Sequence, residues 1–147
     1  MGTSRAVVRR VGASGLTLAG KGASGHWIPM DTSVEVGGAD AATRPLELLL
    51  IALGGCSSMD VLSILAKKRI KLDDLEVELE ADRAEEHPKV MTAIRVVYRF
   101  YGDNLRPEDL EQAVNLSEEK YCSVAGMLRR AAPIATRIEI HPPRPAR

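Results

Sequence analysis

RPLELLLIALGGCSSMDVLSILAKKR, residues 44–69, is the longest and most apolar helical candidate in the chain. It contains one of the chain's two cysteines, Cys56, and between residues 46 and 56 only Glu47 is charged. A helix that is apolar on all sides is usually buried on all sides. This stretch therefore predicts a long, buried central helix around which the rest of the chain is arranged.

Both ends of this helix carry terminal signals. Thr43 is a good N-cap, Pro45 suits the first turn, and the cations at residues 67–69 favour the C-terminal end of the helix dipole. Gly54 and Gly55 precede the cysteine, and each glycine costs a helix about 1 kcal/mol relative to alanine. We expect either a close neighbour there, such as a second helix or a ligand, or a simple kink.

Alternating apolar and polar residues predict strands on both sides of the central helix. The expected elements are a β-meander over about 3–36 (a hairpin, a short strand at 26–30 and another at 34–36), a hairpin of 75–81 with 90–101, helices over 107–120 and 123–132, and a strand over 134–140. Strands and helices grouped in blocks indicate an α+β class. We expect one domain over residues 1–147, with a C-terminal β/α block at about 74–140 and a solvated tail at 141–147.

Charge and cysteine content limit the function classes. Lys plus Arg and Asp plus Glu are 20 each, so no basic excess points to nucleic acid. The N-terminal segment lacks the apolar run of a signal peptide, and the run at 46–56 is too short to span a bilayer. The two cysteines are 66 residues apart, and together with the three histidines they show none of the spacings typical of metal ligands. We expect a cytoplasmic protein without a metal site or cofactor.

The two cysteines are the candidates for chemistry. Cys56 lies in the apolar helix, where a lone cysteine is commonly a small core residue. Cys122 lies just before a predicted helix, whose N-terminus lowers the pKa of a nearby thiol; it could equally be a boundary thiol without a role. Together they favour a two-cysteine peroxidase, in which one thiolate is oxidised to sulfenic acid and the second thiol converts it to a disulfide. An external dithiol would then reduce that disulfide.

Three segments resemble the OsmC/Ohr family, the osmotically induced protein C and organic hydroperoxide resistance proteins. They are GASGHWIPMD, RPLELLLIALGGCSSMD and EKYCSVAGML, and the similarity runs from about residue 5 to residue 140. It implies an OsmC-like fold, with antiparallel sheets around the central helix, in an intertwined homodimer with active sites at the interface. It also implies that Cys56 is the peroxidatic and Cys122 the resolving cysteine. The implied substrates are organic hydroperoxides, and the implied reductant is an external dithiol such as a protein-bound lipoyl group.

Two features depart from the family pattern. The family's second motif reads Cys-Pro-Tyr-Ser, whereas Cys122 is followed here by Ser-Val-Ala. The Ohr branch has an arginine in the N-terminal loop, but residues 20–30 contain only Lys21 and His26 as basic residues. The chain therefore resembles a less characterised OsmC-like branch. The alternative functions are a non-catalytic dimer that binds a small apolar ligand, or a structural stress protein whose cysteines fill the core.

Four further residues are considered for the site. Glu47 is nine residues before Cys56, which places it on the opposite helix face and ~13 Å away along the axis. It could act there only across the dimer or through an intervening residue; otherwise it is an early-turn acid, with Arg44 as a local ion partner. His26 could line the site or pack in a strand. Asp60 shares the Cys56 face, where its charge disfavours a thiolate unless it is paired elsewhere.

Overall fold

The computed structural model describes residues 2–145, which form two compact units. The division lies between Leu49 and Leu50, within the long helix α1 (Pro45–Lys67). Each unit contains one small sheet. The α+β class and the long helix over residues 44–69 are confirmed, with the helix ends within two residues of the predicted ones.

The first unit is built on a three-stranded antiparallel sheet. Its strands are β1 (Ala6–Arg10), β2 (Leu18–Gly22) and β3 (Trp27–Met30), in the order β1-β2-β3. The predicted hairpin and short strand are confirmed, and β3 lies at an edge, where a proline is tolerated. The predicted strand at 34–36 is wrong. Val34–Val36 is a 3₁₀ turn, which Gly37 ends at φ 89°, a left-handed conformation that glycine adopts readily.

The second unit contains the greater part of α1, a sheet, two further helices and a connecting turn. Its strands are β4 (Asp74–Arg83), β5 (Met91–Tyr101) and β6 (Ile134–His141); its other elements are α2 (Pro107–Leu116), the π-helical turn η2 (Ser117–Tyr121) and α3 (Ser123–Leu128). β4 and β5 form the predicted antiparallel hairpin, but β6 pairs with β5 in parallel. The expectation of antiparallel sheets is therefore wrong for this pair. The helices between β5 and β6 form a crossover, which returns the chain in the same direction.

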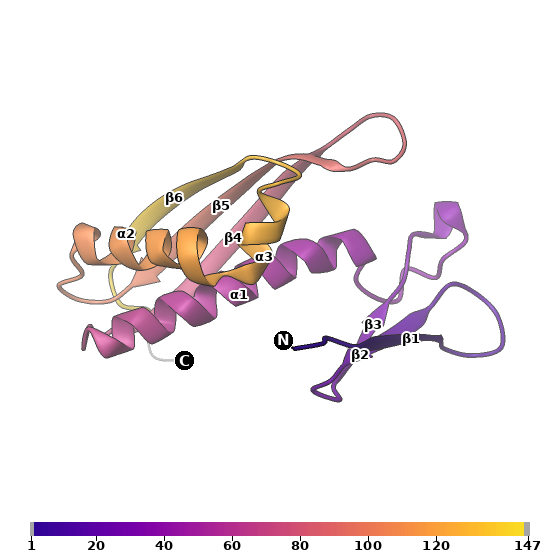
Figure 1. Cartoon of the computed structure of the whole chain (residues 1–147), viewed down its shortest axis with the longest axis horizontal. Helices are drawn as coiled ribbons and strands as arrows, with labels where there is room; N and C mark the ends of the chain where they lie inside the picture. The colour runs from indigo at the N-terminus through magenta and orange to yellow at the C-terminus, as the bar shows by residue number, and fades with distance from the viewer. Residues whose placement is uncertain (1, 146–147) are drawn as a thin grey trace. The chain divides into compact units, whose positions relative to one another are not determined.

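The core of the second unit lies between its sheet and its helices. Alternate residues of β5 are buried, among them Ile94, Tyr98 and Phe100. In Figure 1, α1 and α2 cover the same face of the sheet. The residues that α1 buries form one stripe, with Leu53, Ser57, Val61 and Leu65 four positions apart and Gly54 beside Leu53.

Within the single chain, the rest of α1 is only partly covered, so the expected burial on all sides is not reached by one chain alone. Ile51 is 57% exposed and Met59 73% exposed in the single chain. As a complete helix of 23 residues, α1 is also long and apolar enough to cross a membrane by length and composition. The run at 46–56 is too short to span a bilayer, but this length limit does not apply to the whole helix. Core helices of soluble proteins meet the same criterion.

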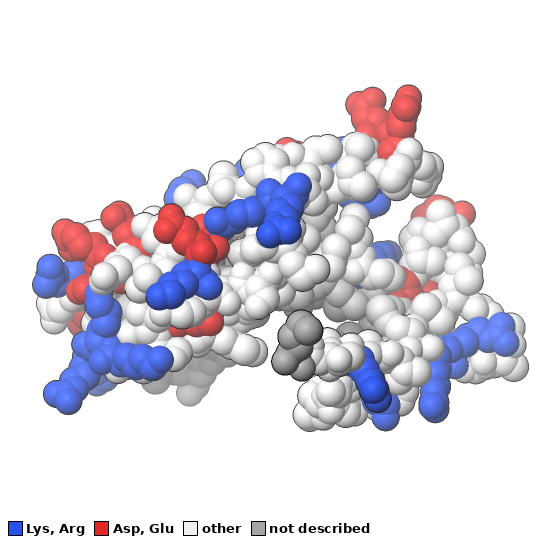
Figure 2. All heavy atoms as spheres, viewed as in Figure 1, with Lys and Arg blue, Asp and Glu red and all other residues white. Residues whose placement is uncertain are grey.

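In the predicted solvated tail, the three described prolines are exposed, whereas His141 and Arg144 contact the sheet. His141 belongs to β6 and stacks on Tyr101 at 5.1 Å between ring centroids. Arg144 covers the same ring at 4.1 Å and pairs with Glu76 at 2.7 Å. Residues 146–147 of the predicted tail lie outside the described part. Acidic and basic side chains are interspersed on the face of the second unit drawn in Figure 2, in line with the zero net charge.

The two glycines before Cys56 have different surroundings. A Cβ atom on Gly54 would lie 2.7 Å from Cδ1 of Leu79, so this glycine lets α1 approach β4 closely. The close neighbour predicted for Gly54 is thus a strand of the same chain. A Cβ atom on Gly55 would have nothing within 4 Å.

The approach of α1 to Leu79 can be tested with Gly54→Ala in two backgrounds. Alanine gains about 1 kcal/mol of helix propensity, but in the natural chain its methyl group displaces Leu79. Urea denaturation should therefore show Gly54→Ala to be more favourable in a Leu79→Ala background by about 1 kcal/mol or more. An equal effect in both backgrounds would contradict the packing described for α1 and β4.

Candidate dithiol site

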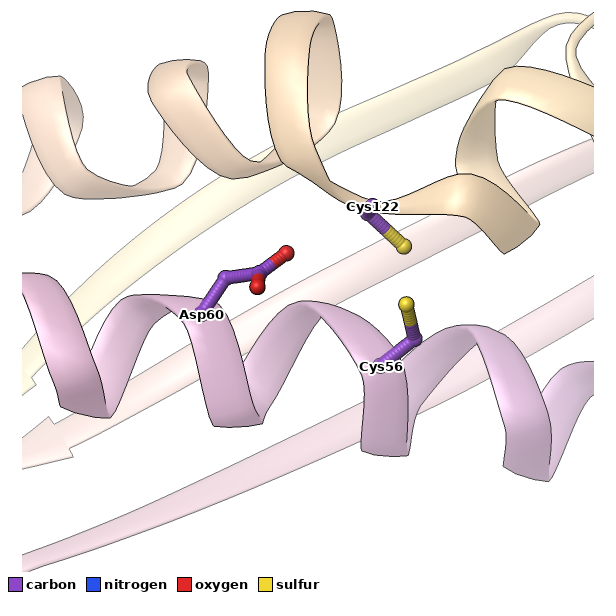
Figure 3. A group of neighbouring side chains, drawn as sticks. All are labelled: Cys56, Asp60 and Cys122. Atoms are coloured by element: carbon purple, nitrogen blue, oxygen red, sulfur yellow. The ribbon is translucent and has the colours of Figure 1, made fainter. Parts of the chain in front are cut away.

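The second unit brings the two cysteines together from distant parts of the sequence. Cys56 lies half-buried in the middle of α1, and Cys122 is only 4% exposed at the start of α3. The two sulfur atoms and a carboxylate oxygen of Asp60 all lie within 4.8 Å of one another. Figure 3 shows the two thiols pointing toward each other, with the Asp60 carboxylate on the same side of α1. The predicted shared face of Cys56 and Asp60 is confirmed.

Ser117 connects the segment before Cys122 to α1. Its backbone carbonyl accepts a hydrogen bond from the Cys122 amide at 2.7 Å, which closes the π-helical turn η2. Its hydroxyl, fully buried, lies 3.0 Å from an Asp60 carboxylate oxygen and 3.4 Å from the Ser57 carbonyl, and donates toward both. This hydrogen bond orients the Asp60 carboxylate but leaves its negative charge beside the sulfur atoms.

The environment of Cys122 favours a protonated thiol. Burial is the largest influence and, together with a hydrogen bond to the Cys56 thiol, raises the pKa of Cys122 to about 11. The amides of Ala125 and Val124 oppose this, and the Ala125 amide donates to the sulfur at 3.3 Å. The lowered pKa expected from a helix N-terminus is therefore wrong, because burial outweighs the effect of the amides at the start of α3.

Tyr98 lies in the core next to this site. Burial raises its pKa to about 12, while a hydrogen bond with Ser57 opposes the shift. Charge on Glu118, Cys122 and Asp60 also contributes to the raised pKa of Tyr98. Tyr98 lies in the strand predicted at 90–101, but strand periodicity carries no information about what its hydroxyl reaches. Ser57 and Ser117 were missed as well, since a serine in a helix is ordinarily a solvated or back-bonding residue.

The other predicted site residues belong to the first unit, where they have local surroundings. The Glu47 carboxylate accepts a hydrogen bond from the Arg44 backbone amide at 3.0 Å, as the acid of a capping box does. The helix begins at Pro45, one residue after the position that a Thr43 cap predicts. The Arg44 guanidinium pairs with Asp40 instead of Glu47. His26 is exposed just before β3. A role for Glu47, Arg44 or His26 at the dithiol remains a prediction.

A groove of about 330 Å³ adjoins the dithiol at Asp60. Its lining combines one acidic, two basic, and several apolar and neutral polar side chains and consists of Asp60, Ser63, Ile64, Lys67, Lys68, Gln112, Leu116 and Tyr121. The Lys68 ammonium is held by Asp109 at 2.8 Å. A small molecule in this groove would touch the residue that neighbours both sulfur atoms.

Chemically, this arrangement is a dithiol with an adjacent carboxylate. Two thiols at this separation can be oxidised to a disulfide after a small movement of the side chains. The same three groups are also of the kinds that bind thiophilic metal ions.

Comparison with known proteins places the chain in a family. Residues 37–137 match the family model described as OsmC-like protein. Protein YhfA of Escherichia coli K12 is 44% identical over 126 residues, which are 86% of this chain and 91% of YhfA.

Solved structures share the fold across nearly the whole chain. A hypothetical protein from Aquifex aeolicus is 32% identical, with a TM-score of 0.83 over 98% of this chain and 100% of that one. The organic hydroperoxide resistance protein OhrB of Bacillus subtilis is 14% identical and shares the fold alone, with a TM-score of 0.64 over 93% of this chain and 98% of that one. The match over residues 37–137 and the identity to YhfA confirm the resemblance to OsmC/Ohr proteins: the chain belongs to the OsmC-like family.

Proposed function

We propose that this protein is a thiol-dependent peroxidase that reduces organic hydroperoxides with Cys56 and Cys122. The observation that carries the proposal is the approach of the two sulfur atoms to within 4.8 Å. Membership in the OsmC-like family indicates a redox stress protein in general terms. The fold neighbours whose names refer to organic hydroperoxide resistance support the choice of substrate class.

The proposed reaction has two steps at the dithiol. The Cys56 thiolate attacks the peroxide, its S–O bond forms as the O–O bond breaks, and the alkoxide leaves as an alcohol after taking up a proton. Cys56 is then a sulfenic acid. The Cys122 sulfur attacks the Cys56 sulfur, water leaves, and a disulfide remains. An external dithiol restores both thiols and becomes a disulfide itself.

The surroundings of the two sulfurs support this division of roles. Cys122 is buried and its pKa is raised to about 11, so it is a poor first nucleophile at neutral pH. Cys56 is the more exposed of the two and can meet a peroxide first. Once Cys56 is a sulfenic acid, the proximity of the Cys122 sulfur raises the rate of disulfide formation. This offsets the small fraction of Cys122 that is a thiolate at neutral pH.

The proposal includes a homodimer and a dithiol reductant. Exposed apolar residues along α1 support a second copy as the partner of this face, among them Ile51 and Met59. In that dimer Glu47, Arg44 and His26 of one chain could approach the dithiol of the other. A lipoyl-bearing protein suits the reductant role, and a cytoplasmic location suits a site that must return to the thiol form. Neither a nucleic acid nor a membrane takes part in the proposed reaction.

Intact mass measurement after peroxide treatment tests the reaction. Reduced protein mixed with one equivalent of cumene hydroperoxide should lose two hydrogens per chain, and peptide mapping should show a Cys56–Cys122 crosslink. Cys122→Ser should stop at the addition of one oxygen on Cys56 or its further oxidation products. Cys56→Ser should leave the peroxide unconsumed. An unchanged mass, or a Cys56→Ser variant as active as the natural protein, would contradict the proposal.

Alkylation of Cys122 tests the electrostatics of the site. Because only the thiolate reacts, a pKa of about 11 predicts slow modification by iodoacetamide at neutral pH. The rate should rise about tenfold per pH unit until the pH approaches that pKa. The urea-unfolded protein, mapped by peptide mass, provides the reference rate. Modification of native Cys122 at or above the unfolded rate at pH 7 would be inconsistent with the buried, protonated thiol.

A second candidate function is a non-catalytic protein that binds a small ligand. The groove beside Asp60 favours it, as does the negative charge that Asp60 brings to the sulfur pair. This candidate predicts that Cys56 is alkylated no faster than an ordinary free thiol. Rapid modification of Cys56 that stays constant down to about pH 6 would require a preformed thiolate and would exclude the candidate.

A further inference from the structure

We propose that the reduced protein binds a thiophilic divalent cation, Zn²⁺ in the first instance, through Cys56, Cys122 and Asp60. Sequence spacing predicts no metal site, because the three residues fall into two segments far apart. The fold nevertheless brings two sulfur atoms and one carboxylate oxygen within 4.8 Å of one another. On binding, each thiol releases its proton to solvent, so the ion is held by two thiolates and one carboxylate. This ligand set combines soft sulfur with a single oxygen, which favours zinc over magnesium or calcium.

The separation of these atoms suits a tetrahedral ion. Zinc lies about 2.3 Å from sulfur and about 2.0–2.2 Å from carboxylate oxygen, so its ligand atoms are about 3.5–4 Å apart. Atoms within 4.8 Å of one another reach these distances by side-chain movements of about 1 Å. Three protein ligands leave the fourth position of the ion for water or another small ligand.

The residues around the ligands already fix their orientation. Asp60 uses one carboxylate oxygen to accept the Ser117 hydrogen bond at 3.0 Å, which leaves its other oxygen for a metal ion. Hydrogen bonds of this type to a ligating carboxylate are common in metal sites. The Ala125 amide restricts the Cys122 sulfur in the same way, at 3.3 Å. The groove lined in part by Asp60 and Ser63 gives the ion and its water a route from solvent.

Metal binding and disulfide formation exclude each other, because both use the same two sulfur atoms. A bound ion would therefore keep the pair reduced and prevent Cys56 from attacking a peroxide. Only this inhibitory effect rests on the proposed peroxidase; metal binding itself does not. Zinc would then act as a regulator of the site rather than as a resident catalyst.

Titration of the metal-free, fully reduced protein with Co²⁺ under oxygen-free conditions tests the site. A near-ultraviolet thiolate-to-cobalt charge-transfer band should appear and saturate at one ion per chain, and added Zn²⁺ should remove it. Asp60→Asn should weaken binding at least tenfold, whereas Asp103→Asn, at an exposed turn, should leave it unchanged. Ser117→Ala should weaken binding by about 10–100-fold through the orientation of Asp60.

The natural protein, oxidised to its disulfide, provides a control that does not depend on whether a substituted variant folds. It should give no charge-transfer band, and reduction should restore the band. Absence of the band in the reduced protein, or equal affinity in Asp60→Asn and the natural chain, would overturn the proposed ligand set. The peroxidase is tested separately, by the peroxide-driven loss of two hydrogens from the metal-free protein. Failure of metal binding can therefore be told apart from failure of the peroxidase.

Discussion

Ser117 is the residue on which the geometry of the dithiol depends. Its carbonyl closes the π-helical turn that ends at Cys122, and its hydroxyl bonds to Asp60 and the Ser57 carbonyl on α1. One buried side chain therefore links the segment that carries Cys122 to the helix that carries Cys56. A π-helical turn widens the end of a helix and often marks a functional site. Here it directs the chain after α2 back toward α1.

The surroundings of Cys122 favour its protonated thiol. Burial and the neighbouring thiol keep Cys122 protonated, and the Asp60 carboxylate adds negative charge beside both sulfurs. Cys122 is therefore a poor first nucleophile, whereas Cys56 is the more exposed thiol and the one that a peroxide can reach first. The same close pair of sulfur atoms can therefore serve either disulfide formation or metal binding.

Local patterns in the sequence predict most elements of this fold. Hydrophobic alternation identifies β4 and β5, and an apolar run with terminal signals identifies α1 within two residues. The pairing direction of β6 could not be obtained this way, because alternation is the same in parallel and antiparallel strands. The exposed face of α1 was missed for a related reason: composition records how apolar a helix is but not whether one chain can cover it. At the site, family motifs identify both cysteines, whereas the raised pKa of Cys122 depends on burial by distant residues.

The central claim is that the folded chain holds Cys56 and Cys122 ready to bridge. The most direct measurement is the equilibrium between dithiol and disulfide in glutathione buffers, which gives the effective concentration of one thiol at the other. The account predicts a value in the native protein that is at least about tenfold above the value in urea, because folding replaces a long random loop by a fixed contact. Equal values in the native and unfolded chains would contradict it.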